Sequence, residues 1–160
     1  MLALSKPRSS LPSLPAAHAA ALLVPTALLA GAIGSQLIGG LVPCEMCIWQ
    51  RWPHVAAVVL ALLAFPLRGA RRALVALAGL AIAVSGAIGV YHAGVELGLL
   101  DGITTCTANA TGLDQIMNAD LVRCDAVQWE LLGVSMAGWN AIISLSAALF
   151  IALGVARGRA

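Results

Sequence analysis

Four long apolar stretches make up most of the chain. They cover residues 19–42, 48–67, 73–95 and 131–155. Each has about the 20 residues that an α-helix needs to cross the hydrocarbon core of a bilayer, and none shows the strict alternation of a half-buried strand. The pattern predicts an all-α membrane protein, a bundle of four transmembrane helices.

The composition excludes an ordinary soluble domain. Of the 160 residues, 61% are apolar and only 10% are charged, whereas globular domains carry about 25% charged residues. The net charge of +2 comes without a basic cluster, which excludes nucleic acid as a partner. We expect a single integral membrane domain over residues 1–160, surrounded by the lipid bilayer.

The charged residues predict how the chain is oriented. Seven of the nine basic residues fall on the side shared by both termini and the loop between the second and third stretches: Lys6, Arg8, Arg68, Arg71, Arg72, Arg157 and Arg159. The two other basic residues and all seven acidic residues fall on the opposite side. Because cytoplasmic loops are enriched in Lys and Arg, we expect cytoplasmic termini and outward loops at residues 43–47 and 96–130.

The first stretch could also be a secretory signal peptide. Lys6 and Arg8 precede it, and residues 30–32 (Ala-Gly-Ala) form a possible small-residue cleavage site. The apolar run continues past this site to Val42, however, and is longer than a usual signal core. This length favours an uncleaved first helix.

All four cysteines fall on the outward side, Cys44 and Cys47 in the first loop and Cys106 and Cys124 in the second. This is the oxidising side of a bacterial inner membrane, where an even number of cysteines indicates disulfides. One pair in each loop is the simplest arrangement, although four cysteines allow three pairings. A static bridge between Cys106 and Cys124 would also stabilise the long loop.

Cys44 and Cys47 form a Cys-x-x-Cys motif before the second apolar stretch. A bridge over two residues restrains the chain little, and such pairs are usually redox-active or metal-binding. A haem site would need His in place of Ile48, and a zinc site built from two close cysteine pairs fails because 17 residues separate Cys106 from Cys124. We therefore predict redox chemistry without a metal, and the N-terminus of the following helix favours the thiolate it requires.

Several of these residues together resemble one known family. Residues 43–51 are Pro-Cys-Glu-Met-Cys-Ile-Trp-Gln-Arg, residues 91–96 are Tyr-His-Ala-Gly-Val-Glu, and Cys106, Cys124 and a Gln-Trp pair at 128–129 follow. On these motifs, the chain resembles the DsbB family of disulfide bond formation proteins, and the resemblance covers essentially all four apolar stretches.

The resemblance implies a four-helix bundle that reoxidises a periplasmic thioredoxin-fold dithiol oxidase of the DsbA type. It also implies that two electrons pass to a membrane quinone, either ubiquinone or menaquinone. The residues support this independently, because thiol–disulfide exchange only redistributes oxidation and a catalyst needs an electron acceptor. The chain has no flavin, haem or metal motif, and a lipid-soluble quinone is available in the bilayer.

By resemblance, each cysteine has a role. The partner's thiolate attacks Cys106 and releases Cys124, and the reduced loop pair is then reoxidised by Cys44 and Cys47. In this scheme Cys47 faces the quinone.

By the same resemblance, Arg51 and His92 flank the quinone ring. A cation near the membrane edge is costly without a partner, and a developing quinone anion or a cysteine thiolate would be such a partner. Arg51 could instead only extend toward the membrane interface, and His92 could only hydrogen-bond a neighbouring helix.

A short amphipathic helix is expected in the periplasmic loop. Apolar residues recur at helical spacing between residues 113 and 121, and Thr111 and Asp114 form a variant capping box. The helix would lie on the membrane surface, although simple packing of the loop would give a similar pattern.

Two other classes of membrane protein fit parts of the pattern. A structural protein with four spans would use its disulfides only to brace the outer loops. An enzyme of the vitamin K epoxide reductase type also joins a four-helix bundle to quinone and thiols, but its quinone-side Cys-x-x-Cys lies late in the bundle. The position of Cys44 and Cys47 before the second span disfavours the latter.

Overall fold

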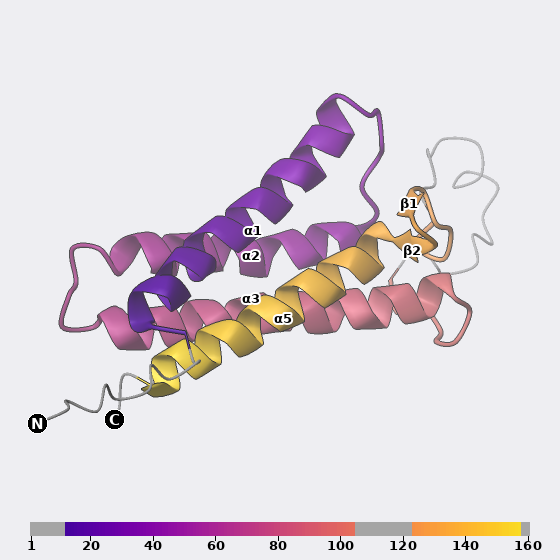
Figure 1. Cartoon of the computed structure of the whole chain (residues 1–160). Helices are drawn as coiled ribbons and strands as arrows, with labels where there is room; N and C mark the ends of the chain where they lie inside the picture. The colour runs from indigo at the N-terminus through magenta and orange to yellow at the C-terminus, as the bar shows by residue number, and fades with distance from the viewer. Residues whose placement is uncertain (1–11, 105–122, 158–160) are drawn as a thin grey trace, which may run out of the picture.

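The computed structural model describes residues 12–104 and 123–157 and shows an all-α bundle (Figure 1). Its four long helices are α1 (Leu14–Leu37), α2 (Glu45–Leu63), α3 (Arg71–Glu96) and α5 (Met136–Arg157). Each is long and apolar enough to cross a membrane. The structure thus confirms the predicted four-helix membrane fold; the short helix expected between residues 111 and 121 lies outside the described residues.

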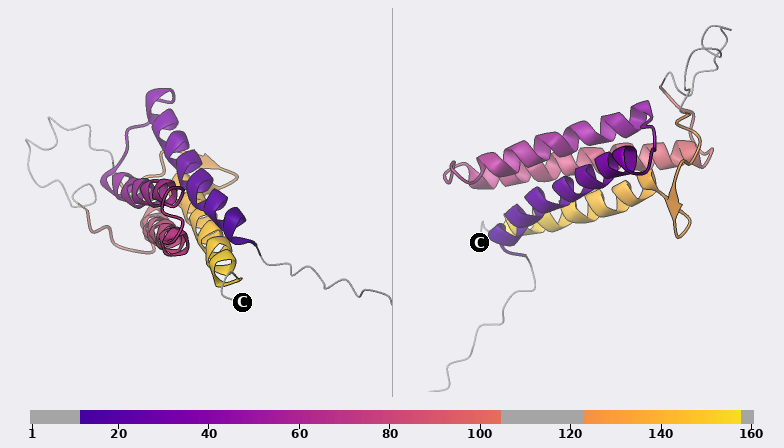
Figure 2. Two further views of the ribbon diagram at one scale, coloured as in Figure 1. Left: turned by 90° about the vertical axis from the view of Figure 1, so that its left-hand side faces the viewer. Right: turned by 90° about the horizontal axis from the view of Figure 1, so that it is seen from above.

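Both ends of the bundle are defined by the path of the chain. The start of α1, the α2–α3 loop and the end of α5 share one end, named here the opposite end (Figure 1). The start of α2, the end of α3 and the start of α5 share the other, named the cysteine end. Neighbouring helices pack as α1 with α5 and α2, and α3 with α5 and α2, which Figure 2 shows from two further sides.

The termini of α1 follow from local chemistry. The Oγ atom of Ser13 accepts a hydrogen bond from the backbone N–H of Ala16 at 3.4 Å and caps the helix. The helix ends at Leu37, five residues before the apolar stretch does, because Gly40 adopts a left-handed conformation with φ of 66°. Pro43 follows and cannot continue a helix.

A small β-hairpin precedes α5. Strands β1 (Glu130–Leu131) and β2 (Val134–Ser135) pair antiparallel. The turn residues Leu132 and Gly133 both have positive φ, 55° and 75°, as in the tight turns that join strands. These conformations do not fit a helix, so α5 begins at Met136 although the apolar stretch begins at residue 131.

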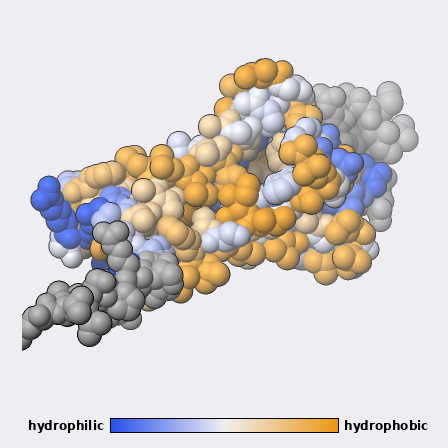
Figure 3. Space-filling model, viewed as in Figure 1, coloured by the Kyte–Doolittle hydropathy of each residue, from blue (hydrophilic) through white to orange (hydrophobic). Residues whose placement is uncertain are grey.

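Small side chains hold the helices close together. The buried core contains many alanines, among them Ala17, Ala21, Ala57, Ala61 and Ala78. A Cβ atom on Gly154 would lie 2.6 Å from the Cβ of Ala17, so α1 and α5 approach as closely as glycine permits. Large apolar side chains face outward instead (Figure 3), as expected of a bundle surrounded by lipid.

Candidate active site

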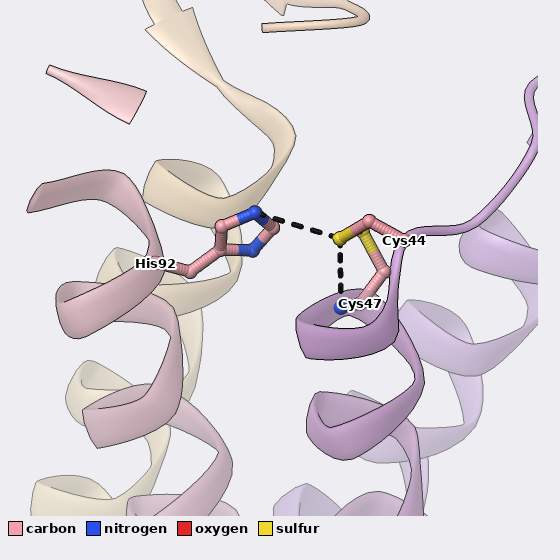
Figure 4. Close-up of side chains that lie close together, drawn as sticks. All are labelled: Cys44, Cys47 and His92. Atoms are coloured by element: carbon pink, nitrogen blue, oxygen red, sulfur yellow. Dashed lines mark hydrogen bonds between the residues drawn. The ribbon is translucent and has the colours of Figure 1, made fainter. Parts of the chain in front are cut away.

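Cys44 and Cys47 lie where α2 begins. Cys44 is the N-cap, and its Sγ atom accepts a hydrogen bond from the backbone N–H of Cys47 at 3.1 Å (Figure 4). The two sulfur atoms are 2.6 Å apart, and both cysteines are free thiols. The helix cap thus places the two sulfur atoms side by side.

The two thiols share a hydrogen bond within a buried setting. Cys44 is 3% exposed. Its hydrogen bond with Cys47, together with burial, raises the pKa of the Cys44 thiol. The bond between the two sulfur atoms therefore links the protonation of one thiol to that of the other.

His92 approaches the pair from α3. Its Nε2 atom lies 3.6 Å from the Sγ of Cys44 (Figure 4), and the ring is 3% exposed. Its other nitrogen, Nδ1, is 2.8 Å from the side-chain amide nitrogen of Gln50 on α2. The ring thus bridges two helices and also faces a reactive sulfur.

Glu96 extends the cluster by one turn of α3. Its carboxylate lies 3.8 Å from Nε2 of His92, and the hydroxyl of Ser135 donates to it. The hairpin that precedes α5 therefore fixes an acidic group beside the histidine.

Arg51 lies one turn after Cys47 and points toward α1. Its guanidinium donates to the side-chain oxygen of Gln36 at 3.0 Å and to the carbonyl of Ala32 at 3.2 Å. Arg51 is half-buried. The two acceptors hold the cation at the cysteine end, between α1 and α2.

A cavity of about 560 Å³ joins these groups. Its wall includes Cys44, Cys47, Arg51 and His92, and the apolar remainder comes mainly from α1 and the start of α5. Its wall takes residues from the C-terminal part of α1 and the start of α2, two segments that diverge from one another in Figure 1. The structure therefore brings the predicted residues of the first cysteine loop, the second helix and the third helix around one space.

Cys124 reaches the same region from the second loop. It is fully buried and disulfide-bonded, and it packs in one apolar cluster with Cys44, Met46 and Val95. The hydroxyl of Thr104 hydrogen-bonds its sulfur at 3.4 Å. Cys106, the other predicted cysteine of this loop, lies outside the described residues.

The segment after Cys124 also borders the cavity. Arg123 and Asp125 form a bidentate pair with N–O distances of 2.6 and 2.9 Å. The Arg123 guanidinium lowers the pKa of the Asp125 carboxyl. Arg123 and Trp129 both line the cavity, so this segment closes its outer side.

Several buried or half-buried polar residues near the site were not predicted. Gln50 and His54 on α2, Ser85 on α3, and Asn140 and Ser144 on α5 form a hydrogen-bonded network inside the bundle. A signal was present in the sequence, because residues 50 and 54, like 140 and 144, are four apart and share a helix face. A polar side chain inside an apolar span costs free energy unless it pairs with another polar group, so such residues indicate a partner or a functional site.

Comparison with known proteins gives the family. The family model described as "Disulfide bond formation protein DsbB" matches residues 15–154. Several curated relatives are named disulfide bond formation protein B, and two of them serve as examples. The one from Xanthomonas oryzae pv. oryzae is 31% identical over 136 residues, 77% of this chain and 79% of the relative. The one from Marinobacter nauticus is 31% identical over 146 residues, 83% and 84% of the two chains.

No solved structure matches the chain. The family match covers all four membrane-spanning helices and the cluster of Cys44, Cys47 and His92. Together with the fold, this match makes the protein a multi-pass membrane oxidoreductase of disulfide bond formation. The chain belongs to the DsbB family.

Proposed function

We propose that the protein reoxidises a periplasmic thioredoxin-fold dithiol oxidase of the DsbA type and passes the electrons to a membrane quinone, ubiquinone or menaquinone. One observation carries the proposal: a thiol pair, Cys44 and Cys47, lies between a second redox-capable cysteine, Cys124, and a cavity within the membrane-spanning bundle. Electrons can enter on one side of the pair and leave on the other.

The proposal includes the orientation of the chain. The protein is a single integral domain of the bacterial inner membrane with cytoplasmic termini and periplasmic loops at residues 43–47 and 96–130. Support comes from the arginines at the opposite end, Arg68, Arg71, Arg72 and Arg157. Reporter fusions after Gly69 and after Gly112 should report cytoplasm and periplasm respectively, and the reverse pattern would refute the assignment.

The loop pair, Cys106 and Cys124, accepts electrons from the partner. A partner thiolate attacks Cys106, the Cys106–Cys124 bond breaks, and Cys124 leaves as a thiolate. The partner's second thiolate then attacks the mixed disulfide and releases Cys106. The partner loses two electrons and two protons, and the loop pair gains them.

Exchange between the two pairs needs little movement, because Cys124 packs in the same cluster as Cys44. The Cys124 thiolate attacks Cys44 and releases Cys47. Cys106 then attacks Cys124, which restores the loop disulfide and releases Cys44. The first pair now holds the two electrons and two protons.

The cavity beside Cys47 suits a quinone head group. Its volume of about 560 Å³ falls within the roughly 300–1,000 Å³ of small-molecule sites, and its wall is apolar apart from a few polar groups that include Arg51 and His92. When bound, a quinone accepts the two electrons and two protons of the Cys44–Cys47 dithiol and leaves as quinol. The fixed guanidinium of Arg51 stabilises negative charge at this position.

The decisive experiment mixes the purified protein anaerobically with a reduced thioredoxin-fold oxidase and a quinone. Quinone absorbance should fall only when all three components are present. Cys47→Ser is the matched control, because it keeps the fold and removes one sulfur of the pair. The proposal would be wrong if the wild-type protein reduced no quinone and its cysteines stayed in disulfides. That result would indicate a structural protein.

A further inference from the structure

Cys44, Cys47 and His92 form a cluster that resembles a site for a soft metal ion. Their two sulfur atoms and one ring nitrogen all lie within 4.8 Å of one another (Figure 4), and thiolate and imidazole are the ligands that zinc prefers. Only an unprotonated ring nitrogen can bind a metal. The role of the cluster therefore depends on which nitrogen of His92 carries the proton.

Gln50 determines the state of Nδ1. The amide nitrogen of Gln50 is 3.2 Å from the backbone carbonyl of Met46, a group that can only accept, so the orientation of the amide is fixed. The same nitrogen is 2.8 Å from Nδ1 of His92. Because Gln50 donates there, Nδ1 accepts, and a neutral His92 carries its proton on Nε2.

Asn140 holds Gln50 in that orientation. The amide nitrogen of Asn140 donates to the carbonyl of Ser85 at 3.2 Å, which fixes this amide too. It also donates to the side-chain oxygen of Gln50 at 2.8 Å. The oxygen of Asn140 in turn accepts from the hydroxyl of Ser144 at 3.0 Å and lies 2.9 Å from Nε2 of His54.

The groups on the Nε2 side of His92 agree with this proton position. The sulfur of Cys44 at 3.6 Å and the carboxylate of Glu96 at 3.8 Å can both accept from an N–H. The other ionisable groups that α2 brings to the cavity are Cys47, Arg51 and His54, and they contact Cys44, α1 and Asn140 respectively. Donors thus face Nδ1 and acceptors face Nε2.

We propose that Gln50 and Asn140 are positioning residues that hold His92 as the Nε2–H tautomer, so that the ring donates a hydrogen bond to the sulfur of Cys44 and does not ligate a metal. The use of this bond rests on the proposed function: when Cys106 attacks Cys124, Cys44 leaves as a thiolate, and the N–H of His92 stabilises that charge. The same tautomer keeps the reduced thiols free of metal ions that would block the pair.

The first test is nitrogen NMR of the histidine rings in the reduced, detergent-solubilised protein. The chain has three histidines, so single replacements assign each signal. His92 should show a protonated Nε2 and an unprotonated Nδ1, whereas a proton on Nδ1 would overturn the inference. His18 is an internal reference, because Arg71 donates to its Nδ1 at 3.0 Å and gives the same tautomer for an unrelated reason.

Gln50→Glu should reverse the signal at His92. A carboxylate accepts from Nδ1, so a proton appears on that nitrogen, while the His18 signal stays unchanged. Ser144→Ala is the matched control, since it removes a buried hydrogen bond to Asn140 but leaves both donations by the Asn140 amide nitrogen. A Gln50→Glu protein with an unaltered His92 signal would show that Gln50 does not set the tautomer.

The second test is titration of the reduced protein with Cd²⁺, followed by the sulfur-to-metal absorption band. If Nε2 is protonated, His92→Phe should change the affinity less than about threefold, whereas loss of a true ligand or its support costs about 10–100-fold. Gln50→Glu should bind Cd²⁺ more tightly, about 10-fold or more, and the double variant with His92→Phe should lose the gain. A 10-fold loss of Cd²⁺ affinity in the single variant His92→Phe would overturn the inference, even if Gln50→Glu does not fold.

Neither measurement uses a quinone or a thiol partner. Failure of quinone reduction with the predicted tautomer and Cd²⁺ affinities would refute the proposed function and leave the positioning role of Gln50 and Asn140 intact. Quinone reduction by a protein with the opposite His92 tautomer would refute the positioning role and leave the proposed function intact.

Discussion

The two ends of the bundle each contain a buried histidine, and the difference between them separates support from chemistry. At the opposite end, Nε2 of His18 donates to the carbonyl of Ala61 at 2.8 Å, and Arg71 donates to Nδ1. At the cysteine end, Gln50 donates to Nδ1 of His92, and Nε2 faces the sulfur of Cys44. Both rings bridge helices, but only His92 faces an atom that can react.

Helix packing follows the same division. Near the opposite end, Gly154 and Ala17 bring α5 and α1 into close contact, and the His18 ring lies 4.5 Å from that of Phe65. At the cysteine end α1 diverges from α2 (Figure 1), and both helices contribute to the wall of the cavity that contains Arg51 and Cys47. The helices are thus closely packed at the opposite end, whereas at the cysteine end they leave a cavity beside the reactive groups.

The largest expected effect at the cysteine end is that of Cys124→Ser. The loop then has no disulfide for the reduced partner to attack, so turnover should fall to background. When oxidised partner is added, the remaining Cys106 thiolate should attack the partner's disulfide and form a mixed disulfide, while the partner's second sulfur leaves as a thiolate. Non-reducing electrophoresis and mass spectrometry of the adduct provide the measurement. The double variant with Cys106→Ser should trap nothing, and an adduct through Cys44 would contradict the assignment of Cys106.

Arg51→Ala should affect the quinone step and leave the thiol step unchanged. Removal of a preorganised charge donor costs about 10²–10³-fold in turnover, and the apparent KM for quinone should rise. Arg51→Lys keeps the charge without the planar fork and should be intermediate. Steady-state kinetics with quinone and partner varied separately test this, with Arg68→Ala at the opposite end as control; weakened partner kinetics with normal quinone kinetics would refute the role.

The sequence predicted the fold because a bilayer leaves few choices. A run of about 20 apolar residues must satisfy its own backbone hydrogen bonds, and a helix does so. The helix ends were less predictable, because the turn at Gly40 and the hairpin at Leu132 and Gly133 depend on single backbone conformations within apolar runs. A hydropathy pattern does not reveal these backbone conformations.

The candidate site was predictable where chemistry is carried by sequence-adjacent residues. Cys44, Cys47 and Arg51 lie within two turns of one another, and the motif indicates their proximity. Gln50 and Asn140 were missed because their significance lies in a contact between α2 and α5, 90 residues apart in the chain. A single polar residue in an apolar span does not reveal its partner.

At the opposite end, Gly154→Ala should destabilise the protein without changing its kinetics. The new Cβ would lie 2.6 Å from the Cβ of Ala17, so α1 and α5 must separate and the free energy of unfolding should fall by about 1–3 kcal/mol. Gly34→Ala is the matched control, since a Cβ there meets nothing within 4 Å. Denaturant unfolding in detergent measures both, and equal stabilities would show that this contact does not hold the bundle together.

The smallest effect, and the sharpest comparison of the two ends, comes from replacing each histidine by phenylalanine. His18→Phe removes the hydrogen bonds to Ala61 and Arg71 and should cost about 1 kcal/mol of stability, while turnover per folded molecule stays at the wild-type value. His92→Phe removes a similar number of bonds and should cost a similar amount, but it also removes the donor beside Cys44, so turnover should fall. Paired unfolding and kinetic measurements on the two variants separate the roles. If His18→Phe slowed turnover as much as His92→Phe, the two ends would be energetically coupled, and a division between a structural end and a reactive end would not describe this bundle.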